Sequence, residues 1–338
     1  MRCAPHPDWH WPHFEHILCG TLNDRERMGL PEHALPGRFD ALLQHAYASL
    51  RCASTEHLLQ TLTDASSTLA QRISSGNLLA LIGDPRIVFD QPEMRDIPGG
   101  QVWIGLPENE VDTVLEQYAG LGLDRAWIEK ECPRHATTLS AYRMARYPVT
   151  NFEYQRFLLD TAHPELPSSW HFRRFPGERA NHPVYTITPA SADAYAAWLA
   201  QRTGRGFRLP TEAEWEWAAA GPEAQAFPWG PAFDADLANT AETGLFASSP
   251  VGAFVGGESA FGLSDMAGNV EEYVADTYAA YPGGAFVADH LVQIHGQYRV
   301  ARGGSFARFR DLARVQRRHG HNPNSATYAM GFRLAETI

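Results

Sequence analysis

The hydrophobic pattern of the sequence changes near residue 92, and this change limits the folds that the chain can adopt. Between residues 36 and 84, apolar residues recur at three- and four-residue spacing, which is typical of amphipathic helices. Further along, short apolar runs alternate with glycine-containing turns, as in PGGQVWIGL and HATTLSAYRMARYPV, and such alternation predicts strands. We therefore expect an α-helical region over residues 1–92 and a strand-rich domain over residues 93–338.

The overall composition argues against two classes of partner. The formal net charge is −11, whereas a nucleic-acid-binding surface needs clustered positive charge, so no nucleic-acid partner is expected. The longest apolar run, LLALIG at residues 78–83, is far too short to cross a membrane. The first residues lack a signal-peptide pattern, and Cys3, Cys19, Cys52 and Cys132 form no disulfide or metal-binding spacing. We expect a cytoplasmic protein without a membrane partner, and the sequence leaves its oligomeric state open.

Three helices are predicted inside the strand-rich half, each from residues that cap its N-terminus. The first covers NFEYQRFLLDT, with Thr150 or Asn151 as the cap. The second begins at Thr188 or Ser191 and covers the apolar residues of DAYAAWLAQRT. The third lies in RLPTEAEWEWAAAG, where a threonine is followed three residues later by a glutamate, the pattern of a capping box.

The order of the motifs in this half resembles one known family. The motifs are YPVTNFEYQRFL, HPVYTITPASADAYAAWL, RLPTEAEWEWAA, FPWG, FGLSDMAGNVEEY, RGGSF and GFRL. In this order they are similar to the formylglycine-generating-enzyme family, also called the sulfatase-modifying-factor family. The resemblance implies an α+β domain, a variant of the C-type-lectin fold with little regular secondary structure. The preceding QRISSGNLLALIGDPR looks like the helical segment that often leads into this domain.

The loop DMAGNVEEY, residues 265–273, groups several oxygen-bearing side chains around a glycine. The resemblance implies a structural calcium ion held by Asp265, the carbonyl groups of Gly268 and Val270, and Glu272. Calcium takes hard oxygen ligands of this kind. The alternative is that Asp265 and Asn269 only tie a tight turn. Glu271 adds a carboxylate where relatives usually carry an aromatic residue.

A second calcium site of the family corresponds here to a weaker set of ligands. Its matching positions are Asn239, the carbonyl of Thr240, Thr243 and the carbonyl of Leu245. Thr243 stands where the family has an aspartate, so the strongest ligand is missing. The adjacent Glu242 points differently along the chain, and we expect this second site not to be fully occupied.

The copper chemistry of the family is not expected in this chain. The aerobic enzymes hold copper(I) with two cysteines near the C-terminus, and soft thiolates suit that ion. No cysteine follows Cys132, and Arg308 falls where the first of the two is expected. Copper-dependent formylglycine generation is therefore not predicted, and Cys132 is interpreted as a buried, inert thiol.

Other branches of the family work without the cysteine pair. The sulfoxide synthases of ergothioneine and ovothiol biosynthesis place a three-histidine iron site on an N-terminal helical domain, and another branch acts in siderophore maturation. This chain has His6, His10, His13 and His16 near its start, at spacings of three and four, although two prolines interrupt a continuous helix. Iron held by these histidines is one interpretation, and histidines on a polar surface are the other.

The segment GGSFARFRDLARVQRRHGHNP is rich in polar and cationic side chains and is the predicted cleft. We assign catalytic roles to Ser305, Arg318, His319 and His321, and substrate binding to Arg308, Arg314 and Asn322. The resemblance places Arg318 in the substrate cleft of the family. Arginine suits carboxylate or phosphate groups, and a histidine can accept a proton near neutral pH. The alternative is that alternate residues of an irregular strand are simply solvated.

Two classes of function remain open. The sequence favours an oxidative or metal-dependent enzyme that modifies a peptide or an amino-acid-derived metabolite, with an anionic small molecule or peptide as substrate. A first alternative is a non-catalytic ligand- or protein-binding module on the lectin-like fold. The tract between RGGS and GFR is not asparagine-rich, as it is in hypervariable binding proteins of this fold, which weakens this alternative. A second alternative is an iron-dependent sulfoxide-synthase-like enzyme that uses the N-terminal histidines.

Overall fold

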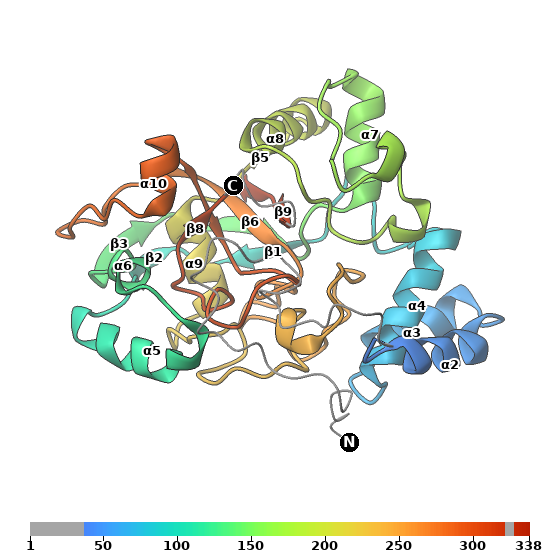
Figure 1. Ribbon diagram of the computed structural model, residues 1–338. Coiled ribbons are helices and arrows are strands. Elements are labelled where there is room, and N and C mark those ends of the chain that lie inside the picture. Colours follow the sequence, from blue (N-terminus) through green and yellow to red (C-terminus); the bar gives the residue numbers. More distant parts are fainter. Residues whose placement is uncertain (1–36, 322–327) are drawn as a thin grey trace.

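In a computed structural model, which describes residues 37–321 and 328–338, the chain begins with a helical unit. This unit consists of α2 (Asp40–Leu50), α3 (Thr55–Thr63) and α4 (Leu69–Ile82), which lie together at one edge of the molecule (Figure 1). Ser54 caps α3, and Thr68 and Gln71 form a capping box at α4. The apolar faces of the three helices share one core with Phe254 of the following domain. The helical periodicity of the sequence is therefore confirmed here.

The rest of the chain forms three small sheets. The first has the order β1 (Met94–Ile97), β4 (Tyr142–Ala145), β10 (Ala335–Thr337) and β5 (Gly206–Arg208). The second pairs β2 (Gly100–Ile104) with β3 (His135–Leu139). The third has the order β8 (His319–Gly320), β7 (Arg299–Arg302), β6 (Glu271–Thr277) and β9 (Met330–Phe332), in which β6 and β9 run parallel.

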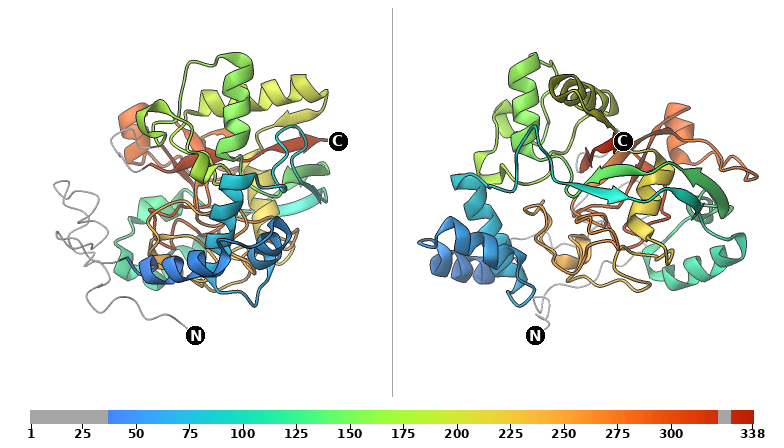
Figure 2. Two further views of the ribbon diagram at one scale, coloured as in Figure 1. Left: turned by 90° about the vertical axis from the view of Figure 1, so that its right-hand side faces the viewer. Right: turned by 180° about the vertical axis from the view of Figure 1, so that it is seen from behind.

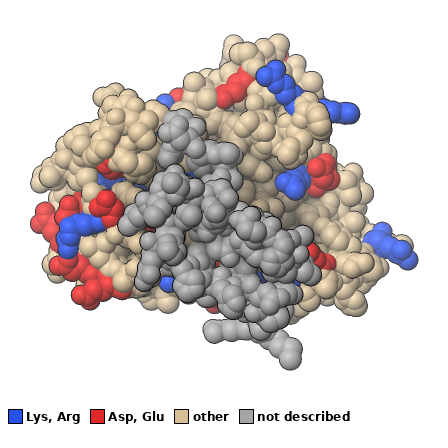
Figure 3. All heavy atoms as spheres, viewed as in Figure 1, with Lys and Arg blue, Asp and Glu red and all other residues tan. Residues whose placement is uncertain are grey.

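Short helices surround these sheets. The α-helices are α5 (Val111–Gln117), α6 (Arg125–Glu129), α7 (Asn151–Thr161), α8 (Pro189–Thr203), α9 (Glu212–Ala220) and α10 (His290–His295). The 3₁₀ turns are η2 (Glu108–Glu110), η3 (Ala119–Leu121), η4 (His171–Arg173), η5 (Gly177–Arg179) and η6 (Ala241–Thr243). The helices α7 and α8 lie side by side on one side of the sheets, with α5 and α6 far from them (Figures 1 and 2). Acidic side chains gather over η2 and α5 (Figure 3).

The capping residues predicted from the sequence start the three helices of this half. Thr150 accepts a hydrogen bond from the backbone of Glu153 and begins α7, so Thr150 rather than Asn151 is the cap. Thr188 caps α8. Thr211 and the glutamate three residues later form the capping box of α9. These contacts are local in the chain, which is why the sequence was sufficient to predict them.

One predicted strand divides into two. The stretch HATTLSAYRMARYPV contains β3 and β4, which belong to different sheets. The chain breaks at Ser140 and Ala141, where the backbone lies against Gly99. A Cβ atom at Gly99 would come within 2.5 Å of the Leu139 carbonyl oxygen, so only glycine fits this close approach.

Two cores hold the domain together. One is rich in aromatic rings and packs α7 and α8 against the sheets, with Tyr154, Phe157 and Tyr195 at its centre. The other surrounds Trp215 of α9 and includes Val300 of β7. The result is a mixed α+β domain of formylglycine-generating-enzyme type with short strands, as expected from the motif order. Among the described residues, no helix has both the length and the apolar character that a membrane span requires.

Candidate functional site

A polar cluster forms where the four-stranded sheet of β8, β7, β6 and β9 meets the loop that follows β7. Glu271 begins β6, His319 lies in β8, and Tyr328 comes two residues before β9. Ser305 and Arg308 come from the loop after β7. We call these five residues the His319 cluster.

Glu271 orients His319. The Glu271 carboxylate is 1% exposed, and its Oε2 atom accepts a hydrogen bond from His319 Nδ1 at 2.5 Å. Burial opposes ionisation of Glu271, but His319, Arg308 and Arg317 outweigh it and lower the pKa of this carboxylate. Burial lowers the pKa of His319 to about 4 although Glu271 lies beside it. At neutral pH the pair is thus an ionised carboxylate and a neutral imidazole whose proton lies on Nδ1.

The second nitrogen of His319 faces Tyr328. The Tyr328 oxygen lies 3.2 Å from Nε2, but its hydroxyl proton is donated to the Gly320 carbonyl. The Nε2 lone pair therefore does not receive this proton and can accept one from a bound molecule. The guanidinium of Arg308 lies 4.9 Å from the Tyr328 ring centre, and the His321 ring packs edge-on at 4.9 Å.

Two buried oxygen atoms in the cluster have no hydrogen-bond partner among the described residues. They are Ser305 Oγ and Glu271 Oε1; the latter has Arg308 Nε at 3.6 Å. The backbone nitrogen of Phe306 bonds the Asn269 carbonyl at 3.1 Å, so Ser305 lies alongside the start of β6. Because buried polar atoms are normally paired, such orphan atoms are typical of sites that bind a ligand.

The structure brings together four of the residues predicted for the cleft: Ser305, Arg308, His319 and His321. The sequence did not predict Glu271 and Tyr328 as site residues. Glu271 is an unusual carboxylate for its position, but the acidic loop around it predicts a cation site and not a contact with a histidine in another strand. Tyr328 carried no signal.

Arg318 forms a buried ion pair in this structure, and its role as the anchor of an anionic ligand stays a prediction. It is 2% exposed, and its Nε and Nη2 atoms donate to both carboxylate oxygens of Glu212 at 2.8 Å. Its Nη1 donates to the Lys130 carbonyl, and its guanidinium lies 4.0 Å from the Tyr281 ring centre. All three nitrogens are already paired, so Arg318 has a structural role.

Arg314 is likewise buried against a carboxylate, and its role as a substrate ligand stays a prediction. It is 3% exposed and donates to Glu131, a carboxylate with no exposed surface. Its guanidinium lies 5.8 Å from the ring centre of Tyr118. The remaining predicted ligand, Asn322, and the four N-terminal histidines proposed for iron lie outside the described residues.

The two predicted calcium ligands of the DMAGNVEEY loop that act through side chains, Asp265 and Glu272, are hydrogen-bonded to other parts of the protein. Both oxygens of Glu272 accept hydrogen bonds from Arg333, at 2.6 and 2.7 Å, and Trp215 donates to one of them. Asp265 instead accepts from the backbone nitrogen of Gly252 at 2.7 Å. Burial raises the pKa of Asp265 to about 6. The side chain of Glu272 is thus used to fix Arg333, and calcium in the loop, including the carbonyls of Gly268 and Val270, stays a prediction.

The second predicted calcium set shows a different pattern. Asn239 Oδ1, Thr240 Oγ1 and Glu242 Oε2 are buried without a partner among the described residues. Thr243 instead donates its hydroxyl to the Ala238 carbonyl at 2.6 Å. Nowhere in residues 37–321 and 328–338 do three or more His, Cys, Asp or Glu side chains form a group able to hold a metal ion. Calcium at Asn239 and Thr240 also stays a prediction.

Cys132 is buried, as expected for a structural thiol. It is 8% exposed, and burial raises its pKa to about 12. A thiol with such a pKa carries almost no thiolate at neutral pH and is a poor nucleophile.

The fold and the motif order together define a domain of the sulfatase-modifying-factor class. Residues 83–338 match the family described as Sulfatase-modifying factor enzyme 1-like domain. The chain belongs to this family, which confirms the resemblance seen in the sequence.

Several curated proteins are similar to this chain. Hercynine oxygenase of Mycolicibacterium smegmatis is 31% identical over 71% of this chain and 60% of its own length. Serine/threonine-protein kinase Pkn1 of Chlamydia trachomatis is 31% identical over 87% of this chain and 49% of its own length. Inactive C-alpha-formylglycine-generating enzyme 2 of Mus musculus is 29% identical over 77% of this chain and 92% of its own length. The chain thus spans 60% and 49% of the lengths of the first two relatives.

Solved structures support the fold. PvdO from Pseudomonas aeruginosa has a TM-score of 0.56 and 28% identity, covering 74% of this chain and 95% of its own. Treponema denticola variable protein 1 has a TM-score of 0.55 and 22% identity, covering 72% of this chain and 95% of its own. The second likeness concerns the fold alone.

Proposed function

We propose that this protein is an oxidative enzyme that acts on an amino-acid-derived substrate at the His319 cluster. The observation that carries the proposal is the buried pair of Glu271 and His319, which leaves His319 Nε2 as a proton acceptor. A similarity to hercynine oxygenase supports the oxidative chemistry and the substrate class. A buried histidine held by a carboxylate is the usual arrangement of a general base.

Each residue of the cluster has a separate task in this proposal. Glu271 keeps the proton of His319 on Nδ1, so that Nε2 accepts a proton from the substrate. Arg308 places a positive charge beside the cluster, which favours an anionic substrate. The Ser305 hydroxyl is positioned to donate a hydrogen bond to that substrate.

An oxygenase also needs a redox-active metal. The described residues do not form a site for one. His6, His10, His13 and His16 are the proposed iron ligands, since neutral imidazole is a suitable ligand for iron.

The test measures oxygen consumption by the purified protein supplied with iron(II) and hercynine, together with product mass. We expect substrate-dependent oxygen uptake that falls by about 100-fold in His319→Gln, because general-base catalysis contributes on this scale. His45→Gln, at an exposed position in α2, is the matched control and should behave as the parent.

Two results would contradict the proposal. One is oxygen uptake that is equal in His319→Gln and the parent, which would exclude the His319 cluster as the site. The other is a protein that binds hercynine but consumes no oxygen at any iron concentration. This second result would favour the non-catalytic binding module, the other function that the fold supports.

A further inference from the structure

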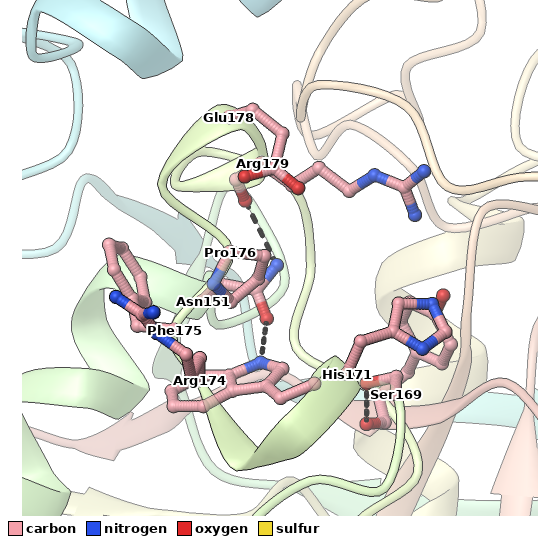
Figure 4. Close-up of a pocket in the computed structure, with 10 residues that line it drawn as sticks. Asn151, Ser169, His171, Arg174, Phe175, Pro176, Glu178 and Arg179 are labelled. Atoms are coloured by element: carbon pink, nitrogen blue, oxygen red, sulfur yellow. Dashed lines mark hydrogen bonds between the residues drawn. The ribbon is translucent and has the colours of Figure 1, made fainter.

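A pocket of about 220 Å³ opens between η4, η5 and the start of α7, outside the His319 cluster (Figure 4). It is lined by Asn151, Ser169, Trp170, His171, Arg174, Phe175, Pro176, Glu178, Arg179 and Tyr185. This volume is smaller than that of a drug-sized site and suits a group about as large as one amino acid. None of the residues predicted for the cleft lines it.

Aromatic rings form the rigid base of the pocket. Trp170 is 5% exposed and donates its indole hydrogen to Asn151 Oδ1 at 2.8 Å. The amide of Asn151 in turn donates to the Arg179 carbonyl at 2.9 Å, which ties the base to the rim (Figure 4). Phe175 packs edge-on against Trp170, with ring centres 5.6 Å apart. The aromatic base of the pocket is therefore fixed before any ligand arrives.

The rim of the pocket is positively charged, although the protein as a whole is acidic. Residues 171–179 contain three arginines and one glutamate, in a chain of net charge −11. Arg174 and Arg179 line opposite sides of the pocket (Figure 4), are exposed, and form no ion pair with a carboxylate of the described chain. Glu178 is the one acidic residue of the lining. Two guanidinium groups without a carboxylate partner among the described residues favour a ligand that carries a carboxylate.

The backbone beside the pocket is strained. Phe172 and Arg173 have φ angles of 53° and 58°, which L-residues other than asparagine, aspartate and glycine seldom adopt. Phe172 is also 97% exposed, so burial of its ring does not offset the strain. Strain of this kind is concentrated at sites that bind ligands.

One aromatic contact joins the pocket to the His319 cluster. Tyr185 lines the pocket and packs edge-on against Phe306, with ring centres 5.5 Å apart. Phe306 directly follows Ser305, and the loop continues to Arg308. The pocket and the cluster thus lie on the two sides of one pair of rings.

We propose that this pocket binds a remote part of the substrate, namely a carboxylate joined to a flat ring. This inference rests on the proposed function, because it assigns the pocket to the substrate that reacts at His319. The ring would pack against Phe175, and Arg174 and Arg179 would hold the carboxylate. Binding energy gained here would position the reacting part of the substrate at the cluster.

The test uses hippurate, a benzoyl-substituted glycine, as the probe and measures its binding to the full-length protein by calorimetry. We expect binding that weakens by about tenfold or more in the double variant Arg174→Gln/Arg179→Gln, since hydrogen bonds to charged groups contribute on this scale. Hippuramide, which lacks the carboxylate, should bind weakly to the parent. Arg51→Gln removes one exposed arginine elsewhere and should bind hippurate as the parent does. Arg179→Lys keeps the charge and shows whether the planar group is required.

The outcomes separate this inference from the proposed function. The assignment of the pocket as a carboxylate-binding site would be overturned by either of two results. One is no hippurate binding by the parent, and the other is unchanged binding by a double variant whose melting temperature is also unchanged. His319→Gln should still bind hippurate while it loses oxygen uptake. If His319→Gln keeps oxygen uptake but the double variant loses hippurate binding, the reaction site at His319 is excluded. The assignment of the pocket as an anion-binding site is then still supported.

Discussion

Glu153 is a buried acid at the start of α7 whose ionisation opposes folding. Its carboxylate accepts hydrogen bonds from the backbone nitrogen and the hydroxyl of Thr150, at 2.8 and 2.7 Å. No cation of the described residues pairs with it, and burial raises its pKa from 4.5 to about 7. The contribution of protonated Glu153 to the free energy of unfolding is therefore fully present below pH 4.5. It is lost as the pH rises through about 7.

We predict that Glu153→Gln becomes more stable than the parent as the pH rises. The glutamine can still accept the bonds from Thr150 but cannot ionise. The advantage should reach about 2 to 3 kcal/mol in the free energy of unfolding at pH 8 and vanish below pH 4.5. Urea unfolding at both pH values measures it, with the exposed Glu116→Gln as the control. An equal difference at both pH values would exclude ionisation of Glu153 as the cause.

His319 gives a second prediction at the scale of a residue. Because its pKa is lowered to about 4, its neutral, proton-accepting form is complete from pH 5 upward. The turnover rate should therefore be flat between pH 5.5 and 8, without the inflection near 6.5 of an ordinary histidine. Glu271→Gln should lower turnover by about tenfold to 100-fold, because the carboxylate would no longer hold the proton of His319 on Nδ1. An inflection near pH 6.5 in the parent would show that another group accepts the proton.

At the scale of elements, buried ion pairs attach α9 to the strands and loops around it. Glu212, in the first turn of α9, accepts from both Arg318 and Arg302. Arg302 of β7 also donates to Glu216, one turn further along the helix, at 2.8 Å. These charges are buried, so removing one partner leaves the other unpaired in the interior.

We predict that Arg318→Lys destabilises the protein without changing hippurate binding. Lysine cannot donate to both oxygens of Glu212 and to the Lys130 carbonyl at once, so the free energy of unfolding should fall by about 2 to 3 kcal/mol. Arg202→Lys, in an exposed pair with Asp160, should change it by about 1 kcal/mol or less. Denaturant unfolding and calorimetry on the two variants provide the measurements. Loss of substrate-dependent oxygen uptake by a fully stable Arg318→Lys would instead support the ligand role that the sequence suggested.

For the molecule as a whole, the last strand closes the domain. The strand β10 lies between β4 and β5, and its residues therefore join the beginning, middle and end of the domain. Ala335 within it has no exposed surface. Such pairings between distant parts of the chain are formed late and at a high entropic cost, so their loss affects the entire fold.

We predict that deletion of residues 335–338 abolishes cooperative unfolding. Without β10, both neighbouring strands would expose unpaired edges and the aromatic core behind them. Deletion of Ile338 alone is the matched control, because this residue is 64% exposed and lies beyond the strand. Near-UV circular dichroism during urea unfolding distinguishes the two. A sharp transition in the longer deletion would show that β10 is dispensable.

The sequence alone determined the features that depend on neighbours in the chain. The sequence predicted helix starts near Thr150, Thr188 and Thr211, because a cap involves residues three or four positions apart. It also predicted the α+β class and the family, which follow from the order of the motifs. The same sequence grouped Ser305, Arg308, His319 and His321 because they lie close together along one segment, and their roles at a site stay predictions.

Tertiary structure alone decided which charged side chains are free and which are already paired. Arg318 meets Glu212 across 106 positions, and Glu271 meets His319 across 48. The pocket at Trp170 likewise depends on Asn151, nineteen positions earlier in the chain. Side chains this far apart are brought together by burial of apolar surface and by sheet pairing, and the residue types themselves do not record their partners. The sequence around an arginine in a polar segment therefore does not show whether that arginine binds a substrate or a buried glutamate. Only the packing of the folded chain distinguishes these two roles.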